Sequence, residues 1–147
     1  MYSFTGANIS ANTKTISIQY FPNNARLRQP MLSQVFTQAL RDKFAVQTNL
    51  NQVSSNGDLS LEGEITGYSV TPTAIQANQT AAQNRLTIEV NVKFVNTKDD
   101  KQSFEQKFSR YADYDSQKDL SSVESTLIQT ITGQLVEDIF NKAVVNW

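Results

Sequence analysis

The sequence predicts an α+β fold, a two-layer sandwich in which two helices pack on one face of a mixed sheet of about four strands. In several short segments apolar and polar residues alternate, which is typical of strands with one buried face. Two longer segments repeat apolar residues at helical spacing. Because the strands keep one polar face, helices can cover only the other, and the expected order is β-α-β-β-β-α.

Composition limits the possible functions. The chain has 147 residues, a net charge of −1, and neither histidine nor cysteine. This length suits a single domain covering residues 1–147, with an irregular lead at residues 1–12. Without His and Cys, the usual zinc sites, thiol chemistry and Ser–His catalysis are excluded, so we expect neither an enzyme nor a cofactor. The balanced charge also argues against a general nucleic-acid binder.

The first third of the chain predicts a strand followed by a helix. Apolar and polar residues alternate over residues 14–20, and Pro22 ends this strand. The helix is expected over residues 29–46, where Pro30 suits the first turn because its missing N–H leaves no hydrogen bond unmade. The apolar stripe of this helix consists of Leu32, Val35, Phe36, Ala39, Leu40 and Phe44.

Two further strands are expected at residues 50–54 and 59–70, separated by an Asn-Gly turn at residues 56–57. In the longer strand, Gly63 and Gly67 are predicted to lie on the apolar face. There they would leave room for a large side chain, such as one from a helix.

The clearest strand is expected over residues 85–96, and its partner over residues 103–112 after a charged turn at residues 98–101. Tyr111 has the opposite parity to the phenylalanines of the partner strand. We therefore expect a bulge or twist near Ser109.

The last helix is expected to begin at a Ser121 or Ser122 cap and to run to about Val145. Gly133 is a weak point within it, because glycine disfavours helix. Its apolar stripe consists of Val123, Leu127, Ile131, Leu135, Ile139 and Ala143.

Four basic residues are candidates for binding an anionic group. Lys93 and Lys107 are expected on the outer faces of neighbouring strands, and Arg85 and Arg110 near the strand ends. If the register matches, they form a small basic strip. The alternative, which is the more common outcome in sheets, is that these basic residues pair with glutamates on neighbouring strands, namely Glu62, Glu89 and Glu105.

Two sets of acidic residues are expected to be solvated rather than catalytic or metal-binding. Glu62 and Glu64 share a strand face, as a catalytic carboxylate pair could, but solvated strand residues are the expected outcome. Asp113, Asp115 and Asp119 could offer oxygens to Ca²⁺, yet their spacing matches no known calcium loop, and a solvated turn is expected.

Four segments together resemble the LptE family, most closely its Bacteroidota branch. They are residues 18–25 (IQYFPNNA), the helix that begins at Pro30, residues 58–68 (DLSLEGEITGY) and residues 138–143 (DIFNKA). They cover nearly the whole chain and are specific in combination, although none is a catalytic signature.

The resemblance implies a non-enzymatic outer-membrane lipoprotein on the periplasmic side. Such a protein plugs an LptD-type β-barrel, helps it assemble and contacts lipopolysaccharide through basic residues on sheet and loop. The candidates for that contact here are the four basic residues above. A family member carries a lipidated Cys near its mature start, where this sequence has Met1, as a soluble form cut after that Cys would. Membrane attachment would therefore need an N-terminal lipid that this chain lacks.

The connection at residues 73–83 and the charged turn at residues 98–101 are candidates for contacting the barrel or the glycolipid. A surface of amides and hydroxyls agrees with a plug, because neutral polar groups are buried at lower cost than charges. The alternative is a periplasmic lipid- or ligand-binding lipoprotein module without a barrel partner, which would need an apolar cavity. The candidate barrel contacts are Thr73, Gln76, Asn78, Gln79, Lys98 and Lys101.

Overall fold

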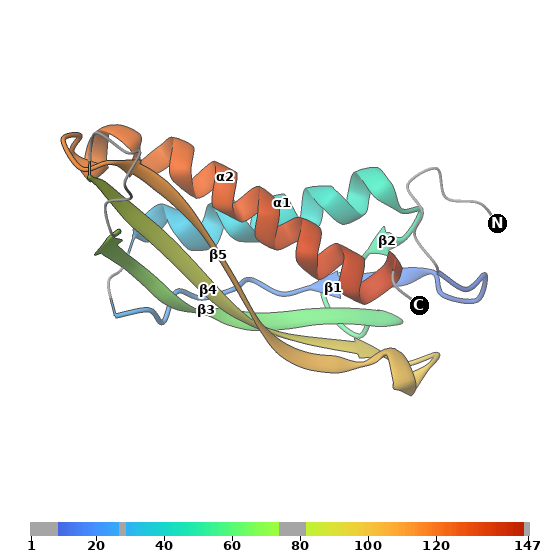
Figure 1. Ribbon diagram of the computed structural model, residues 1–147. Helices are drawn as coiled ribbons and strands as arrows, with labels where there is room; N and C mark the ends of the chain where they lie inside the picture. The colour runs from blue at the N-terminus through green and yellow to red at the C-terminus, as the bar shows by residue number, and fades with distance from the viewer. Residues whose placement is uncertain (1–8, 27–28, 74–81, 146–147) are drawn as a thin grey trace.

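A computed structural model describes residues 9–26, 29–73 and 82–145 of the chain. Figure 1 shows both helices on the same side of the sheet, so the predicted two-layer α+β sandwich is confirmed. The elements in chain order are β1 (Thr15–Ile18), α1 (Pro30–Gln47), β2 (Asn51–Gln52), β3 (Leu59–Pro72), β4 (Gln83–Asn96), the 3-10 turn η1 (Asp100–Gln102), β5 (Phe104–Asp115), α2 (Leu120–Phe140) and the π-helical turn η2 (Asn141–Val145).

The sheet has five strands in the order β2-β1-β3-β4-β5. β1 runs parallel to both β2 and β3, whereas β3, β4 and β5 pair antiparallel, so the sheet is mixed as predicted. The strand predicted at residues 50–54 forms only over the two residues of β2, which pairs with β1 at the edge and brings the predicted count of about four to five. The long antiparallel strands β3, β4 and β5 therefore make up most of the sheet.

α1 forms where the apolar stripe predicted it, and both of its ends have local causes. The side-chain oxygen of Gln29 accepts a hydrogen bond from the Met31 N–H, and Pro30 occupies the first turn. At the other end, the Thr48 hydroxyl and N–H both donate to the Phe44 carbonyl. The face turned to the sheet buries Leu32, Phe36, Leu40 and Phe44.

β1 ends at Ile18, earlier than predicted, although the Gln19 N–H still donates to the Leu61 carbonyl of β3. The guanidinium of Arg41 on α1 donates to the Ile18 carbonyl through Nε at 3.2 Å and Nη2 at 2.9 Å. Tyr20, predicted on the apolar face, is 55% exposed, and the next residue, Phe21, is fully buried instead. The Phe21 ring packs edge-on against Phe36 of α1.

Of the two glycines in β3, only Gly63 lies on the apolar face. A Cβ there would be 1.9 Å from the Asn91 carbonyl oxygen and 2.9 Å from the Phe21 ring, so glycine makes room for Phe21 rather than for a helix side chain. A bulge between Ile65 and Gly67 shifts the register, and Gly67 faces Glu89 on the outer face. The prediction for Gly67 was therefore wrong, because one extra residue reverses the side-chain alternation.

The bulge predicted near Ser109 is absent from the β4–β5 ladder. The register runs without interruption from the Gln83–Asp115 pair to the Phe94–Phe104 pair. Tyr111 simply points to the outer face, where the Arg85 guanidinium lies 3.8 Å from the centre of its ring. This contact gives the exposed aromatic ring a favourable partner without a change of register.

α2 packs beside α1 through the edge-on rings of Phe44 and Phe140. The helix begins after Asp119, not at a serine cap: the Ser122 N–H and hydroxyl both donate to the Asp119 carbonyl. Near this end, the buried Tyr68 hydroxyl donates to Glu124 and ties the helix to β3. Within the described residues, no helix has the length and apolar character needed to cross a membrane.

Alanine at two glycines should have opposite effects on stability. Gly63→Ala places a methyl group against backbone and should lower the free energy of unfolding by about 1 to 3 kcal/mol. Gly133→Ala, at an exposed helix position with no atom within 4 Å of the new Cβ, should raise it by about 1 kcal/mol. Urea unfolding measures both, and a neutral Gly63→Ala would contradict the close approach of Phe21 and Asn91.

Candidate functional site

Lys93 and Lys107 lie on the outer face of the sheet, on adjacent strands. Lys93 stands in register between Glu62 on β3 and Glu105 on β5, and Lys107 stands opposite Asn91. The two lysines are thus diagonal neighbours, at a Cα separation of about 7 to 8 Å. Both are exposed, and neither amine forms an ion pair within the described part of the chain. An anionic group could therefore reach both amines from solvent.

Arg85 lies on the same face but is already engaged. Its Nε and Nη2 donate to the two carboxylate oxygens of Asp113 at 2.8 and 3.2 Å, and its guanidinium stacks on Tyr111. The hydrogen bond to Asp113 raises the pKa of Arg85 above its ordinary value. Arg85 is also separated from Lys93 by about 26 Å along β4, given 3.3 Å per residue. A single small ligand could not bridge the two.

Arg110 lies on the opposite face from the other three basic residues. It stands opposite the buried Ile88, and its Nε and Nη2 donate to Asp138 of α2 at 2.7 and 2.8 Å. This pairing raises the pKa of Arg110 above its ordinary value. The four residues therefore do not form one strip: without a bulge near Ser109, Arg110 stays on the helix-covered face and ties β5 to α2.

The candidate barrel contacts divide between the two ends of the long strands. Gln76, Asn78 and Gln79 lie outside the described residues. The Thr73 N–H and hydroxyl both donate to the Gln83 carbonyl where β3 and β4 meet, at the end drawn on the left of Figure 1.

The other two candidates lie at the opposite end of β3 and β4, where Lys98 shortly precedes η1 and Lys101 lies within it. A strand of this length spans about 45 Å at 3.3 Å per residue. The two groups of candidates therefore belong to separate surfaces.

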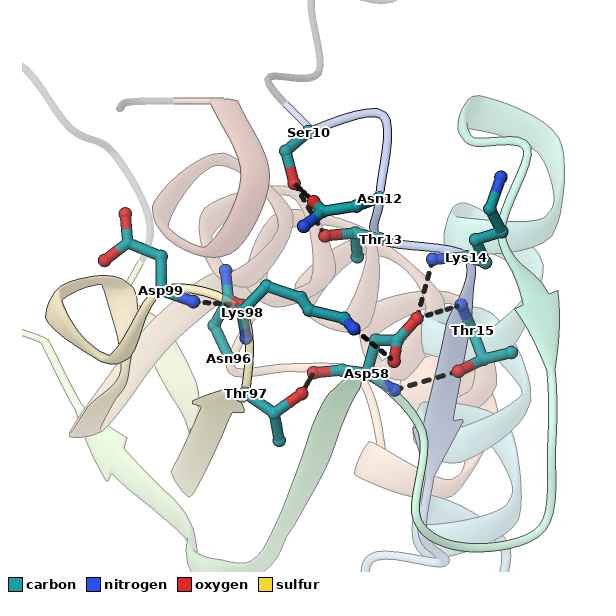
Figure 2. Close-up of polar contacts among 10 residues, drawn as sticks. All are labelled: Ser10, Asn12, Thr13, Lys14, Thr15, Asp58, Asn96, Thr97, Lys98 and Asp99. Atoms are coloured by element: carbon teal, nitrogen blue, oxygen red, sulfur yellow. Dashed lines mark hydrogen bonds and ion pairs between the residues drawn. The ribbon is translucent and has the colours of Figure 1, made fainter.

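A polar cluster around Asp58 joins three segments at the end of the molecule that carries Lys98 (Figure 2). Asp58 Oδ2 accepts hydrogen bonds from the backbone N–H groups of Lys14 at 2.8 Å and Thr15 at 3.3 Å. In return, the Asp58 N–H donates to the Thr15 hydroxyl, and its carbonyl accepts from the N–H and hydroxyl of Thr97. Lys98 Nζ lies 3.8 Å from Oδ1.

The hydrogen bond from the Lys14 N–H is the main reason that the pKa of Asp58 lies below its ordinary value of 3.8, and Thr15 and Lys98 contribute further. Sequence reasoning did not single out Asp58. The available signal was its position directly after an Asn-Gly turn and before a strand, where an Asp side chain often binds backbone N–H groups.

A cavity of about 240 Å³ adjoins this cluster. Leu59, Ala143 and Val144 form its apolar part, while the N-terminal residues and the η1 region supply polar groups. A second hollow, a shallow open groove of about 510 Å³, runs between β5 and α2 and is lined by Arg110, Gln129, Thr130, Gly133, Gln134, Glu137 and Asp138. Neither is an enclosed apolar cavity of the kind that the lipid-carrying alternative needs.

The acidic candidates have ordinary partners. Glu64 accepts a hydrogen bond from the Asn24 side chain at 2.7 Å, and Glu62 stands opposite Lys93. Asp113 binds Arg85, and Asp115 accepts from the Gln117 N–H. Among the described residues, no group of three or more His, Cys, Asp or Glu could hold a metal ion.

Residues 13–143 match the model of a family described as lipopolysaccharide-assembly, LptE. The chain belongs to the LptE family. The match includes the polar cluster around Asp58, both helices and all five strands. Among curated proteins, none is significantly similar in sequence. Membership of the Bacteroidota branch stays a prediction.

Solved structures of lipoproteins share the fold. A minor lipoprotein from Acinetobacter baumannii is 13% identical with a TM-score of 0.56, covering 88% of this chain and 91% of its own. The rare lipoprotein B from Shewanella oneidensis is 15% identical with a TM-score of 0.56, covering 87% and 92%. An uncharacterized lipoprotein B from Nitrosomonas europaea is 11% identical with a TM-score of 0.53, covering 95% and 86%. At these identities, the likeness concerns the fold alone.

Replacing Asp58 by Asn should reduce stability in a pH-dependent way. The pKa of Asp58 is lower in the folded chain than its ordinary value of 3.8, so its stabilisation is present above pH 3.8 and is lost as the pH falls through the folded pKa. Asp58→Asn should therefore unfold at lower urea concentration than the wild type at pH 7, and the difference should shrink below pH 3.8.

Asp100→Asn, an exposed carboxylate in η1, is the matched control and should change the midpoint little. A difference between Asp58→Asn and the wild type that is the same at pH 7 and pH 3 would contradict the role of the charge.

Proposed function

We propose that this LptE-family chain is a non-enzymatic subunit of the outer-membrane machinery that assembles lipopolysaccharide. In this role it plugs an LptD-type β-barrel and helps it assemble. The observation that carries the proposal is the family match over residues 13–143, which spans the whole folded body. The full-length protein would be held on the periplasmic side of the outer membrane by an N-terminal lipid.

The surface of the helix layer supports a plug. The lumen of a membrane barrel is polar, and a protein that fills it must bury polar surface. Gln34 and Gln38 on α1, and Gln129 and Gln134 on α2, are all exposed. Amides exchange water for protein partners at lower cost than charges do. Where the exposed side chains are amides, the surface can be enclosed by a polar wall without burying a charge.

The amines of Lys93 and Lys107 are the best candidates for contact with lipopolysaccharide. Its phosphates are anionic, and two adjacent amines without carboxylate partners can bind one phosphate group. Arg85 and Arg110 contribute less, because Asp113 and Asp138 already occupy their guanidinium groups. The neighbouring Glu62 and Glu105 limit this site to weak binding that depends on salt concentration.

The barrel proposal is tested by purifying the tagged full-length protein from its native membranes. A large β-barrel, identified by mass spectrometry as LptD-like, should be recovered in near-equal amount. An unrelated lipoprotein of the same membrane, tagged in the same way, is the control. Repeated recovery of the protein without any barrel, above all with bound lipid, would overturn the proposal in favour of a lipid-binding module.

The lipopolysaccharide contact is tested by the double variant Lys93→Glu, Lys107→Glu. Since a hydrogen bond to a charged group contributes about 1.5 kcal/mol or more, binding should weaken roughly tenfold or more. Titration of lipopolysaccharide at fixed salt measures the effect. Lys118→Glu makes one such charge reversal at an exposed position outside the sheet and should change binding little. Unchanged binding in the double variant would remove both lysines from the site.

A further inference from the structure

Gly133 of α2 has no reason within the described part of the molecule to be glycine. It is exposed in the interior of a helix, and a Cβ added to it would meet no atom within 4 Å. Glycine at such a position costs about 1 kcal/mol of helix stability relative to alanine. Glycine is, however, the residue that lets another chain approach a backbone closely. The absence of an internal contact therefore points to a contact outside this chain.

The first four turns of α2, which include Gly133, expose no charged side chain, and one turn further on the exposed Glu137 pairs with Lys43 of α1. From residue 121 to residue 134 the exposed side chains of α2 are hydroxyls, amides and the bare glycine, over about four helical turns. Glu124, the charged residue of this stretch, directs its carboxylate to the Tyr68 hydroxyl. The exposed residues are Ser121, Ser122, Ser125, Thr126, Gln129, Thr130, Gly133 and Gln134.

The surface is also hollowed. Gly133 lines the open groove of about 510 Å³ between α2 and β5, together with Gln129, Thr130 and Gln134. Arg110 and Asp138 close one side of this groove and neutralise each other through two hydrogen bonds. Glu137 also lines the groove and pairs with Lys43 of α1. A partner that enters the groove therefore meets neutral polar groups and two ion pairs, so it needs no charge of its own.

The outer face of the sheet is different in character. Its three long strands present charged side chains at alternate positions, and several have no ion-pair partner. Enclosing that face would remove unpaired charges from water, at a cost of several kcal/mol for each. These charged residues are Glu62, Glu64, Arg85, Glu89, Lys93, Glu105, Lys107 and Asp113.

We propose that the α2 face around Gly133 (the residues named above with its groove) is the surface that docks against the polar inner wall of the partner barrel. A barrel strand turns every second side chain into the lumen, and Gly133 lets one of these side chains reach the helix backbone. The outer sheet face then stays in contact with water or with anionic ligand. This inference rests on the proposed function and adds which face of the protein contacts the barrel.

The test compares Gly133→Arg with Gly133→Ala and Ser109→Arg in the tagged full-length protein. Gly133→Arg adds a long charged side chain to the proposed contact, Gly133→Ala adds one methyl group, and Ser109→Arg adds the same charge on the outer sheet face. Recovery of the LptD-like barrel should fall at least tenfold for Gly133→Arg, fall by a smaller factor for Gly133→Ala, and stay within about twofold of the wild type for Ser109→Arg. Circular dichroism confirms that each variant is folded.

A photo-crosslinking amino acid at Gln134, compared with one at Ser109, gives a measurement that does not depend on affinity. The barrel should crosslink to position 134 and not to position 109. Equal recovery with Gly133→Arg and with the wild type, or crosslinking from position 109 alone, would overturn the face assignment. If the wild type recovers no barrel, the proposed function itself fails, and the inference fails with it.

Discussion

The packing of Phe21 over Gly63 joins the three main parts of this fold. The ring lies against the bare backbone of β3 and against Phe36 of α1, and the Phe21 N–H donates to the Thr37 hydroxyl. Just after it, the Ile65 N–H of β3 donates to the Pro22 carbonyl, and the Asn24 N–H donates to the Ile65 carbonyl. One buried aromatic residue thus helps to set how the chain follows β3 after the first strand and where the first helix lies. The close approach is possible only because position 63 has no side chain.

The distribution of charge follows from covering one face of the sheet with both helices. Arg110 lies on the covered face and meets Asp138, whereas the basic residues on the open face meet water or a neighbouring strand. The exposed face of α2 over residues 121–134 presents neutral amides and hydroxyls, and the open face of the sheet presents charges. The molecule therefore has two surfaces of different chemistry, one suited to enclosure by a polar wall and one suited to an anionic ligand.

In the candidate site, the alternation of side chains along a strand predicts the face of some residues correctly and of others not. Alternation along β4 places Lys93 on the open face, and it does so in the structure. Arg110 is two residues after the buried Phe108, so alternation alone places it on the helix-covered face. The bulge expected near Ser109 would have moved it to the open face. The real bulge lies in β3, where it reverses Gly67. Asp58 was missed because its partners come from segments about forty residues away in the chain.

The sequence by itself determined the element order, both helical stripes, the one-sided sandwich and the family resemblance, because these depend on periodicity and on short local phrases. Only the tertiary structure decided the pairing of the arginines, the position of the bulge, the close approach at Gly63 and the open space above Gly133. The physical reason is that strand register and backbone contact depend on residues distant in the chain. A shift of one residue in a strand changes the face of every side chain that follows.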